Sequence, residues 1–318
     1  MPSVGHRVRT QLATAALLVL TLVLGFAAIW QSASVSEDSP RPPALIRALA
    51  SVPGEVADEA LLETTFRAEE LPTGQKEAFF YRLTLPPGAR LPSLAGPLCG
   101  CWGEMALAGA GAEIVQSGAY TLRLDAPMRI QRNGASGALE EIPAGTEIRL
   151  GSGDTAIYPD NTALGAIGNG GEEPVVVVGV AISSTERSGI PAPVLPTGVT
   201  LEMLAQTPSS AWQSLPAGPV SVSVWRLTLP AATRVGPYEA TGLESLWIET
   251  GRIQRIFWPP GETEPWGPPM FYPAGTEAPF TATTPGVRRV VTSEDDLSAM
   301  LLVLSIEPAG VWSRTLAP

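Results

Sequence analysis

The sequence predicts an all-β protein in which two similar domains follow an apolar N-terminal segment. The 318 residues include 32 glycines and 32 prolines. Glycine permits the positive φ angles of tight turns, and proline interrupts helices. Short apolar runs recur between these turn residues, as they do in β-strands. One strand motif occurs twice, which is typical of duplicated domains. Each domain is therefore predicted to be a β-sandwich or a small barrel.

Composition excludes several classes of function. Hydrophobic residues make up 45% of the chain and charged residues 16%, which predicts a packed core rather than disorder. The formal net charge is −11, and the sequence has no run of Lys and Arg such as a phosphate-binding surface needs, so nucleic acid is not expected as a partner. His6 is the only histidine and lies in the N-terminal tail. The folded part is therefore not expected to contain His-based metal sites or Ser-His-Asp triads.

The segment Leu12–Trp30 carries no charged residue. As a helix with a rise of about 1.5 Å per residue it would be roughly 28 Å long, close to the thickness of the hydrocarbon core of a bilayer. Arg7 and Arg9 precede it, and Glu37 and Asp38 follow it. The positive-inside rule then places the N-terminus in the cytoplasm and the rest of the chain on the other side.

Two interpretations of this segment remain open. A signal peptide would be cleaved near Ser32–Ser34, where small residues suit the peptidase. An uncleaved anchor agrees better with the length of the run, which exceeds the apolar region of about 7–15 residues in signal peptides. Trp30 is also of a residue type found at membrane interfaces. We expect a membrane-anchored protein whose folded part is extracytoplasmic, or a secreted protein if the segment is cleaved.

Two short sequences recur in the same order along the chain. RLTLP occurs at Arg82–Pro86 and again 144 residues later (226 − 82), at Arg226–Pro230. PAGTE occurs at Pro143–Glu147 and again 130 residues later (273 − 143), at Pro273–Glu277. Two matches in one order indicate a duplicated domain rather than a short-period solenoid.

These observations divide the chain into segments and predict individual strands. The segments are a cytoplasmic tail at 1–11, the transmembrane or signal segment at 12–30, a linker at 31–60, domain 1 at 61–186, a linker at 187–197 and domain 2 at 198–314. Tyr81, Leu83 and Leu85 alternate with polar residues, which predicts a strand with one buried face. Val175–Val178 and its counterpart Leu301–Ile306 are apolar on both faces, which predicts strands that are covered on both sides.

With its repeat and its strands, the sequence resembles the cupin superfamily in its two-domain, bicupin form. Cupin domains are jelly-roll barrels, also called double-stranded β-helices, and their first motif is G-x5-H-x-H-x3,4-E-x6-G. Glu244 and Gly251 fit the end of this motif, and its first histidine position falls on Tyr238. Glu104 and Gly111 fit in the same way in domain 1. The resemblance implies two tandem cupin-like barrels after the N-terminal helix.

The second cupin motif, G-x5-P-x-G-x2-H-x3-N, is partly kept in domain 1. Gly153 and Pro159 stand at their positions, and Leu164 stands where the motif has histidine. The resemblance implies a family whose usual metal is held by three histidines and a glutamate. One carboxylate cannot hold a transition metal alone, so we expect neither a metal nor a cofactor.

Glu104 and Glu244 are the carboxylates that the resemblance places on the face lining each barrel. Strand alternation puts Glu244 on the same face as Ile248. A buried carboxylate needs a partner. Such a carboxylate either hydrogen-bonds a bound ligand, and could then also serve as a general acid or base, or forms a structural pair with an arginine. The paired arginine would be Arg82 for Glu104 and Arg226 for Glu244.

Other candidates come from two short segments. Tyr158 and Asp160 lie at the remnant of the second motif, where they either face the mouth of a cavity or stabilise the turn. Cys99 and Cys101 form a strained disulfide, remain free or intermolecular thiols, or bind a soft metal. The complete set of candidate ligand-binding residues is Cys99, Cys101, Trp102, Glu104, Tyr158, Asp160, Tyr238 and Glu244.

Three functions are compatible with these features. The first is a membrane-tethered extracytoplasmic bicupin that binds a small molecule or a partner, without catalysis, in a metal-free barrel. The second is a metal-free isomerase, epimerase or lyase that acts on a sugar-like substrate. The third is a redox or soft-metal protein that uses Cys99 and Cys101. We expect the first, with the membrane contacted through the N-terminal helix; the sequence does not define an oligomeric state.

Overall fold

The structure is a computed structural model, and all the residues it describes belong to one compact unit, Pro40–Pro318. The described residues are 50–51, 56–91, 109–160, 164–185, 195–207, 209–212, 217–239, 242–281, 287–294 and 296–311, without the side chains of 164–165 and 279–281. The predicted apolar segment 12–30 lies outside them. Among the residues that are described, no helix has the length and apolar character needed to cross a membrane.

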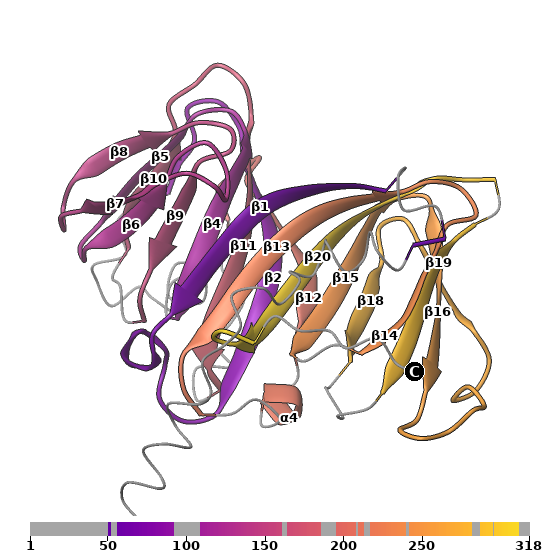
Figure 1. Cartoon of the computed structure of the whole chain (residues 1–318). Helices are drawn as coiled ribbons and strands as arrows, with labels where there is room; N and C mark the ends of the chain where they lie inside the picture. Colours follow the sequence, from indigo (N-terminus) through magenta and orange to yellow (C-terminus); the bar gives the residue numbers. More distant parts are fainter. Residues whose placement is uncertain are drawn as a thin grey trace, which may run out of the picture. The chain divides into compact units, whose positions relative to one another are not determined.

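The described chain is built almost entirely of β-strands, which confirms the predicted all-β fold (Figure 1). The strands of the first half are β1 (Ala57–Phe66), β2 (Lys76–Leu85), β3 (Arg90–Leu91), β4 (Ala110–Ser117), β5 (Tyr120–Leu124), β6 (Met128–Gln131), β7 (Leu139–Ile142), β8 (Glu147–Leu150), β9 (Thr155–Tyr158), β10 (Leu164–Asn169) and β11 (Val175–Ser184). Those of the second half are β12 (Thr200–Gln206), β13 (Val220–Leu229), β14 (Arg234–Glu239), β15 (Leu243–Thr250), β16 (Arg252–Trp258), β17 (Met270–Pro273), β18 (Glu277–Thr281), β19 (Arg288–Ser293) and β20 (Ala299–Pro308). Two short helical turns accompany them, η1 (Ala68–Glu70) and α4 (Ser209–Trp212).

The strands pair into four sheets, two for each half of the chain. Large sheet 1 has the order β12-β2-β11-β4-β9-β6-β7, and small sheet 1 has the order β3-β10-β5-β8. Large sheet 2 has the order β1-β13-β20-β15-β18, and small sheet 2 has the order β14-β19-β16-β17. We call large and small sheet 1 together barrel 1, and large and small sheet 2 together barrel 2.

Each half of the chain contributes one strand to the large sheet of the other half. β1, which comes first in the chain, pairs antiparallel with β13 along its whole length (Figure 1). β12, which opens the second half, pairs antiparallel with β2. The sequence ranges 61–186 and 198–314 therefore do not coincide with the two sets of sheets. In addition, residues 57–60, at the end of the predicted linker, form the start of β1.

The two large sheets share an apolar core. Side chains from β1, β2, β4, β11, β13, β15 and β20 meet in this shared core, among them Leu62, Phe80, Val180, Val222 and Leu304. A second cluster, from β2 to β11, fills barrel 1, and a third, mainly from β13 to β20, fills barrel 2. The central strands of each large sheet are thus covered on both faces, and each of these buried side chains contributes about 1.5–3 kcal/mol of hydrophobic stabilisation.

The face assignments made from the sequence are confirmed. Tyr81, Leu83 and Leu85 all point into the core of barrel 1. In β11, Val177 packs inside barrel 1, whereas the next residue, Val178, packs in the shared core. β20 alternates between the core of barrel 2 and the shared core in the same way. The continuous apolar character of both strands follows from their cover on two sides.

Candidate functional site

A buried carboxylate on β4 is the polar centre of barrel 1. Glu113 is 1% exposed. It accepts a hydrogen bond from the Tyr81 hydroxyl on β2 at 2.9 Å and from the Tyr120 hydroxyl on β5 at 2.7 Å. Each carboxylate oxygen takes one hydroxyl. Because β2 and β4 belong to large sheet 1 and β5 to small sheet 1, this residue links the two sheets of the barrel.

The ionisation of this cluster is set by burial. Burial raises the pKa of Glu113 above its ordinary value of 4.5, and the hydrogen bonds from Tyr120 and Tyr81 act in the opposite direction. Burial and the nearby carboxylate raise the pKa of Tyr81, Tyr120 and Tyr158 well above 10. The tyrosine hydroxyls therefore stay protonated, and those of Tyr81 and Tyr120 donate to Glu113.

Two glycines make room for the tyrosine rings of barrel 1. A Cβ on Gly179 of β11 would lie 2.2 Å from Cζ of Tyr81, and one on Gly111 of β4 would lie 2.6 Å from the ring of Tyr158. Real Cβ atoms do not approach so closely, so both rings lie directly against bare backbone. This packing fixes the rings beside Glu113, which lies directly opposite Gly179 and two residues after Gly111 on β4.

Barrel 2 holds its carboxylate among cationic side chains instead. Glu244 on β15 is fully buried and accepts a hydrogen bond from the Tyr238 hydroxyl at 3.0 Å. Its Oε1 lies 3.3 Å from Nη1 of Arg289 and 3.9 Å from Nη2 of Arg255. Arg255 also stacks over the ring of Phe257, with 4.9 Å between Cζ and the ring centroid. Burial lowers the pKa of Arg255, and the adjacent Arg289 adds to this effect.

The predicted pairing of Glu244 with Arg226 is wrong. Arg226 contacts Glu59 and Glu249 on the outside of barrel 2, and the arginines beside Glu244 come from β16 and β19. A signal for them exists in the sequence. Arg255 stands two residues after the buried Ile253 in an alternating strand, so it occupies a position that faces the core.

The register of the sheets also corrects the predicted motif of domain 1. Gly118 follows β4 and Gly251 follows β15, the strands that pair with β11 and β20, and their φ angles are 84° and 76°. Gly111 lies seven residues before Gly118, and Glu244 lies seven residues before Gly251. Gly111, inside β4, is therefore the equivalent of Glu244. Glu104, which was matched to Glu244, lies outside the described residues. Glu113 is instead equivalent to Leu246, because both lie opposite the β11 and β20 residues Gly179 and Val303.

Of the other predicted site residues, Tyr158 and Asp160 are described. Cys99, Cys101 and Trp102 lie outside the described residues. Tyr158 is fully buried in barrel 1, whereas Asp160 is partly exposed and its backbone N–H donates to Glu70 O at 2.8 Å. Only Tyr238 and Glu244, from the original set, form a described hydrogen bond with each other. No group of three or more His, Cys, Asp and Glu suited to a metal ion occurs within the described part of the chain.

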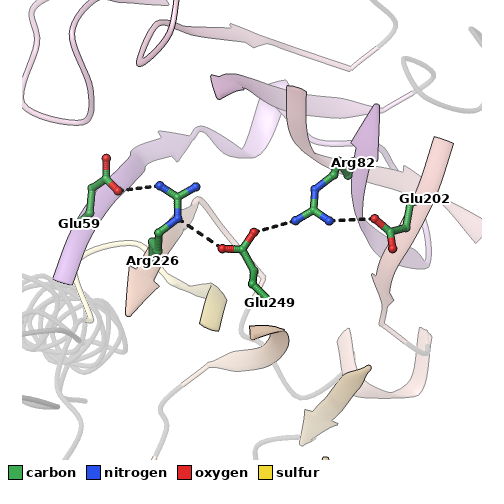
Figure 2. Close-up of polar contacts among 5 residues, drawn as sticks. All are labelled: Glu59, Arg82, Glu202, Arg226 and Glu249. Atoms are coloured by element: carbon green, nitrogen blue, oxygen red, sulfur yellow. Dashed lines mark hydrogen bonds and ion pairs between the residues drawn. The ribbon is translucent and has the colours of Figure 1, made fainter. Parts of the chain in front are cut away.

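A chain of charged residues joins the two halves at the edge of the shared core (Figure 2). Glu249 lies 2.8 Å from Nη2 of Arg82 and 3.4 Å from Nε of Arg226, so it contacts the arginine of both RLTLP copies. Arg82 also pairs with Glu202 at 2.9 Å, and Arg226 with Glu59 at 2.7 Å. These side chains are partly exposed, so each pair is expected to contribute only about 0–1 kcal/mol.

An open groove lies on the outer face of small sheet 1. Its volume is about 540 Å³, and it is lined by residues of β3, β5, β8 and β10. The floor is low because β10 contributes Ala166 and Gly168, which project little or nothing outward. This volume falls in the range of about 300–1,000 Å³ that is typical of small-molecule sites. No sequence motif marks this groove, since its residues come from four separate strands.

Comparisons with known proteins find similar solved structures but no matching family model. No protein-family model matches the sequence, and no curated protein matches it. Solved structures similar to this chain include a cupin 2 conserved barrel domain protein from Leptotrichia buccalis, with 9% identity over 77% of this chain and 89% of that chain and a TM-score of 0.31. Another is procruciferin, an 11S globulin from Brassica napus, with 11% sequence identity and a TM-score of 0.39. The match covers 72% of this chain and 78% of that chain. AerE from Microcystis aeruginosa has 11% sequence identity and a TM-score of 0.33, and the match covers 78% of this chain and 98% of that chain. These similar structures include cupin-domain proteins.

The pKa of Glu113 predicts how stability depends on pH. Because burial holds this pKa above 4.5 in the folded state, the folded state binds the proton more tightly than the unfolded state. The contribution of Glu113 to stability is therefore fully present below about pH 4.5 and falls as pH rises toward the folded-state pKa, by about 1.4 kcal/mol for each pKa unit between the two values. In Glu113→Gln this contribution is absent. The free energy of unfolding of the wild type minus that of the variant should thus fall as pH rises above about 4.5, measured by urea denaturation.

Tyr120→Phe provides the matched variant for this test. It removes a hydrogen bond that lowers the pKa of Glu113, so its stability should fall more steeply with pH than that of the wild type. A difference between wild type and Glu113→Gln that increases with pH would contradict the assignment of Glu113 as a buried group with a raised pKa.

Proposed function

We propose that this chain is a non-enzymatic binding protein of the bicupin type, which takes a small molecule in the groove on the outer face of small sheet 1. The observation that carries the proposal is the contrast between the interior and the exterior of barrel 1. Inside, Glu113, Tyr120 and Tyr158 are at most 1% exposed. Outside, the same barrel has an open groove of about 540 Å³.

The buried carboxylates are suited to a structural role. A general acid or base must come within hydrogen-bond reach of its substrate. Both carboxylate oxygens of Glu113 accept hydrogen bonds from tyrosine hydroxyls. Glu244 contacts Tyr238 and two arginines and is fully buried. Both networks connect strands of different sheets, and buried networks of this kind make a core rigid. The geometry therefore favours binding over acid–base catalysis.

The bicupin assignment rests on features of the chain itself. The sequence repeat, the exchange of β1 and β12, and the pairing of one large and one small sheet in each barrel all agree with two tandem jelly-roll domains. Glu244 stands at the position where the cupin motif has its glutamate, and Tyr238 replaces the first histidine. The hydrogen bond between Tyr238 and Glu244 therefore joins two positions that hold metal ligands in the family.

Filling the groove tests the proposal. Ala166 lies on β10 in the groove, so Ala166→Trp should block binding without entering the barrel core. We expect the wild type to retain a small molecule from a cell extract, detected by affinity-selection mass spectrometry, and Ala166→Trp to lose at least about 90% of it, which corresponds to about 1.4 kcal/mol of affinity. Leu139→Trp is the control, because Leu139 is 53% exposed on β7, a strand that does not line the groove. Equal retention by both Trp variants, or none by the wild type, would contradict the proposal.

We further propose that residues 12–30 hold this binding protein at the membrane, with the folded part outside the cytoplasm. The support is the uncharged run of 19 residues between a basic N-terminal flank and an acidic C-terminal flank. Intact-mass measurement of protein from a membrane fraction should give a chain that still contains residues 12–30. A mature mass that begins near Val35 would show a cleaved signal peptide instead.

A further inference from the structure

The groove on small sheet 1 is bordered by three arginines. Arg90 on β3, Arg123 on β5 and Arg149 on β8 all line it. Their side chains face outward because the neighbouring residues, such as Leu122 and Leu150, are fully buried in barrel 1. Strand pairing, rather than sequence, brings these three arginines together.

The register places the arginines around the low floor of the groove. Gly168 lies between Arg90 on one side and Thr121 on the other, and Thr121 is opposite Arg149. Ala166 is opposite Arg123 in the next row. Guanidinium groups thus flank a strip of β10 that has almost no outward side chains.

The floor of the groove is held firmly. The side chain of Asn169 donates hydrogen bonds to Leu85 O at 3.0 Å and Glu173 O at 2.7 Å, and its Oδ1 accepts one from Gly171 N at 2.8 Å. These contacts attach the end of β10 to β2 and to the following turn. A site on strands that are fixed in this way positions a ligand more accurately than one on loops.

The three arginines also differ from most others in the molecule. The described arginines that form ion pairs are Arg67, Arg82, Arg129, Arg132, Arg226, Arg252, Arg255 and Arg289. Within the described residues, Arg90, Arg123 and Arg149 form no ion pair, although Glu147 is the cross-strand neighbour of Arg123. The groove therefore combines three guanidinium groups with one carboxylate, in a chain whose formal net charge is −11.

We propose that this groove binds a small molecule carrying two or more carboxylate or phosphate groups. A guanidinium group stays protonated and offers a planar pair of donors that matches both oxyanions. Three such groups around one floor suit a ligand with several negative charges. The volume fits a small molecule, and the acidic protein would repel a long polyanion. This inference rests on the proposed function and names the ligand class of the same groove.

Titration calorimetry on the full chain in detergent tests the ligand class, with citrate and inorganic pyrophosphate as probes and glycerol as the uncharged control. We expect one citrate or pyrophosphate per chain, weaker binding as salt increases, and no heat with glycerol. Arg123→Gln and Arg149→Gln should each weaken binding at least about tenfold, since hydrogen bonds to charged groups are lost. Glu147→Gln should strengthen it by on the order of threefold, the effect of one removed surface charge.

Arg234→Gln is the matched control for these variants. Arg234 is exposed on β14, away from the groove, and its loss should leave both affinities unchanged. Tighter binding of pyrophosphate than of citrate would identify phosphate as the preferred group, and the reverse order would identify carboxylate. Binding of neither probe to the wild type, or equal weakening by Arg234→Gln, would overturn the inference.

The outcomes also separate this inference from the proposed function. If the wild type retains a neutral compound that Ala166→Trp loses, and neither probe binds, the groove is a binding site but its ligand is not an oxyanion. If Ala166→Trp retains the compound as well as the wild type does, the groove itself is not the binding site.

Discussion

The apolar core shared by the two large sheets is the constraint on which the rest of the structure depends. Leu62, Phe80 and Val222 are fully buried there, although they come from three different parts of the chain. Exchange of β1 and β12 extends both large sheets with a strand from the other half. The central strands of both large sheets therefore have no free face, whereas small sheet 1 presents an outer face to solvent, and the open groove lies on that face.

The interiors of the two barrels are filled in different ways. In barrel 1 the row of residues across β2, β4 and β11 holds Tyr81, Glu113 and Gly179, and the equivalent row of barrel 2 is apolar. Barrel 2 has its carboxylate, Glu244, one inward-facing position earlier, where barrel 1 has Gly111. Tyrosines partner Glu113, whereas one tyrosine and two arginines partner Glu244. Both solutions satisfy the requirement that a buried carboxylate be hydrogen-bonded.

Much of the fold could be predicted from the sequence, because it depends on local alternation and on the repeat. The inward face of Tyr81, Leu83 and Leu85 is an example. The strand exchange could not be predicted, since the neighbour of an edge strand is chosen by packing between distant segments. The motif match at Gly111 failed because a glycine at a fixed spacing is a weak signal, and only strand register showed that Gly118 is the equivalent of Gly251. The groove was missed because its arginines lie far apart in sequence.

Differential scanning calorimetry of the full chain tests the central claim that the two barrels form one structural unit through their shared core. The account predicts one unfolding transition, with a van't Hoff enthalpy equal to the calorimetric enthalpy, because neither large sheet is complete without a strand from the other half. Two separable transitions, each with about half of the total enthalpy, would show that the barrels unfold independently and would contradict it.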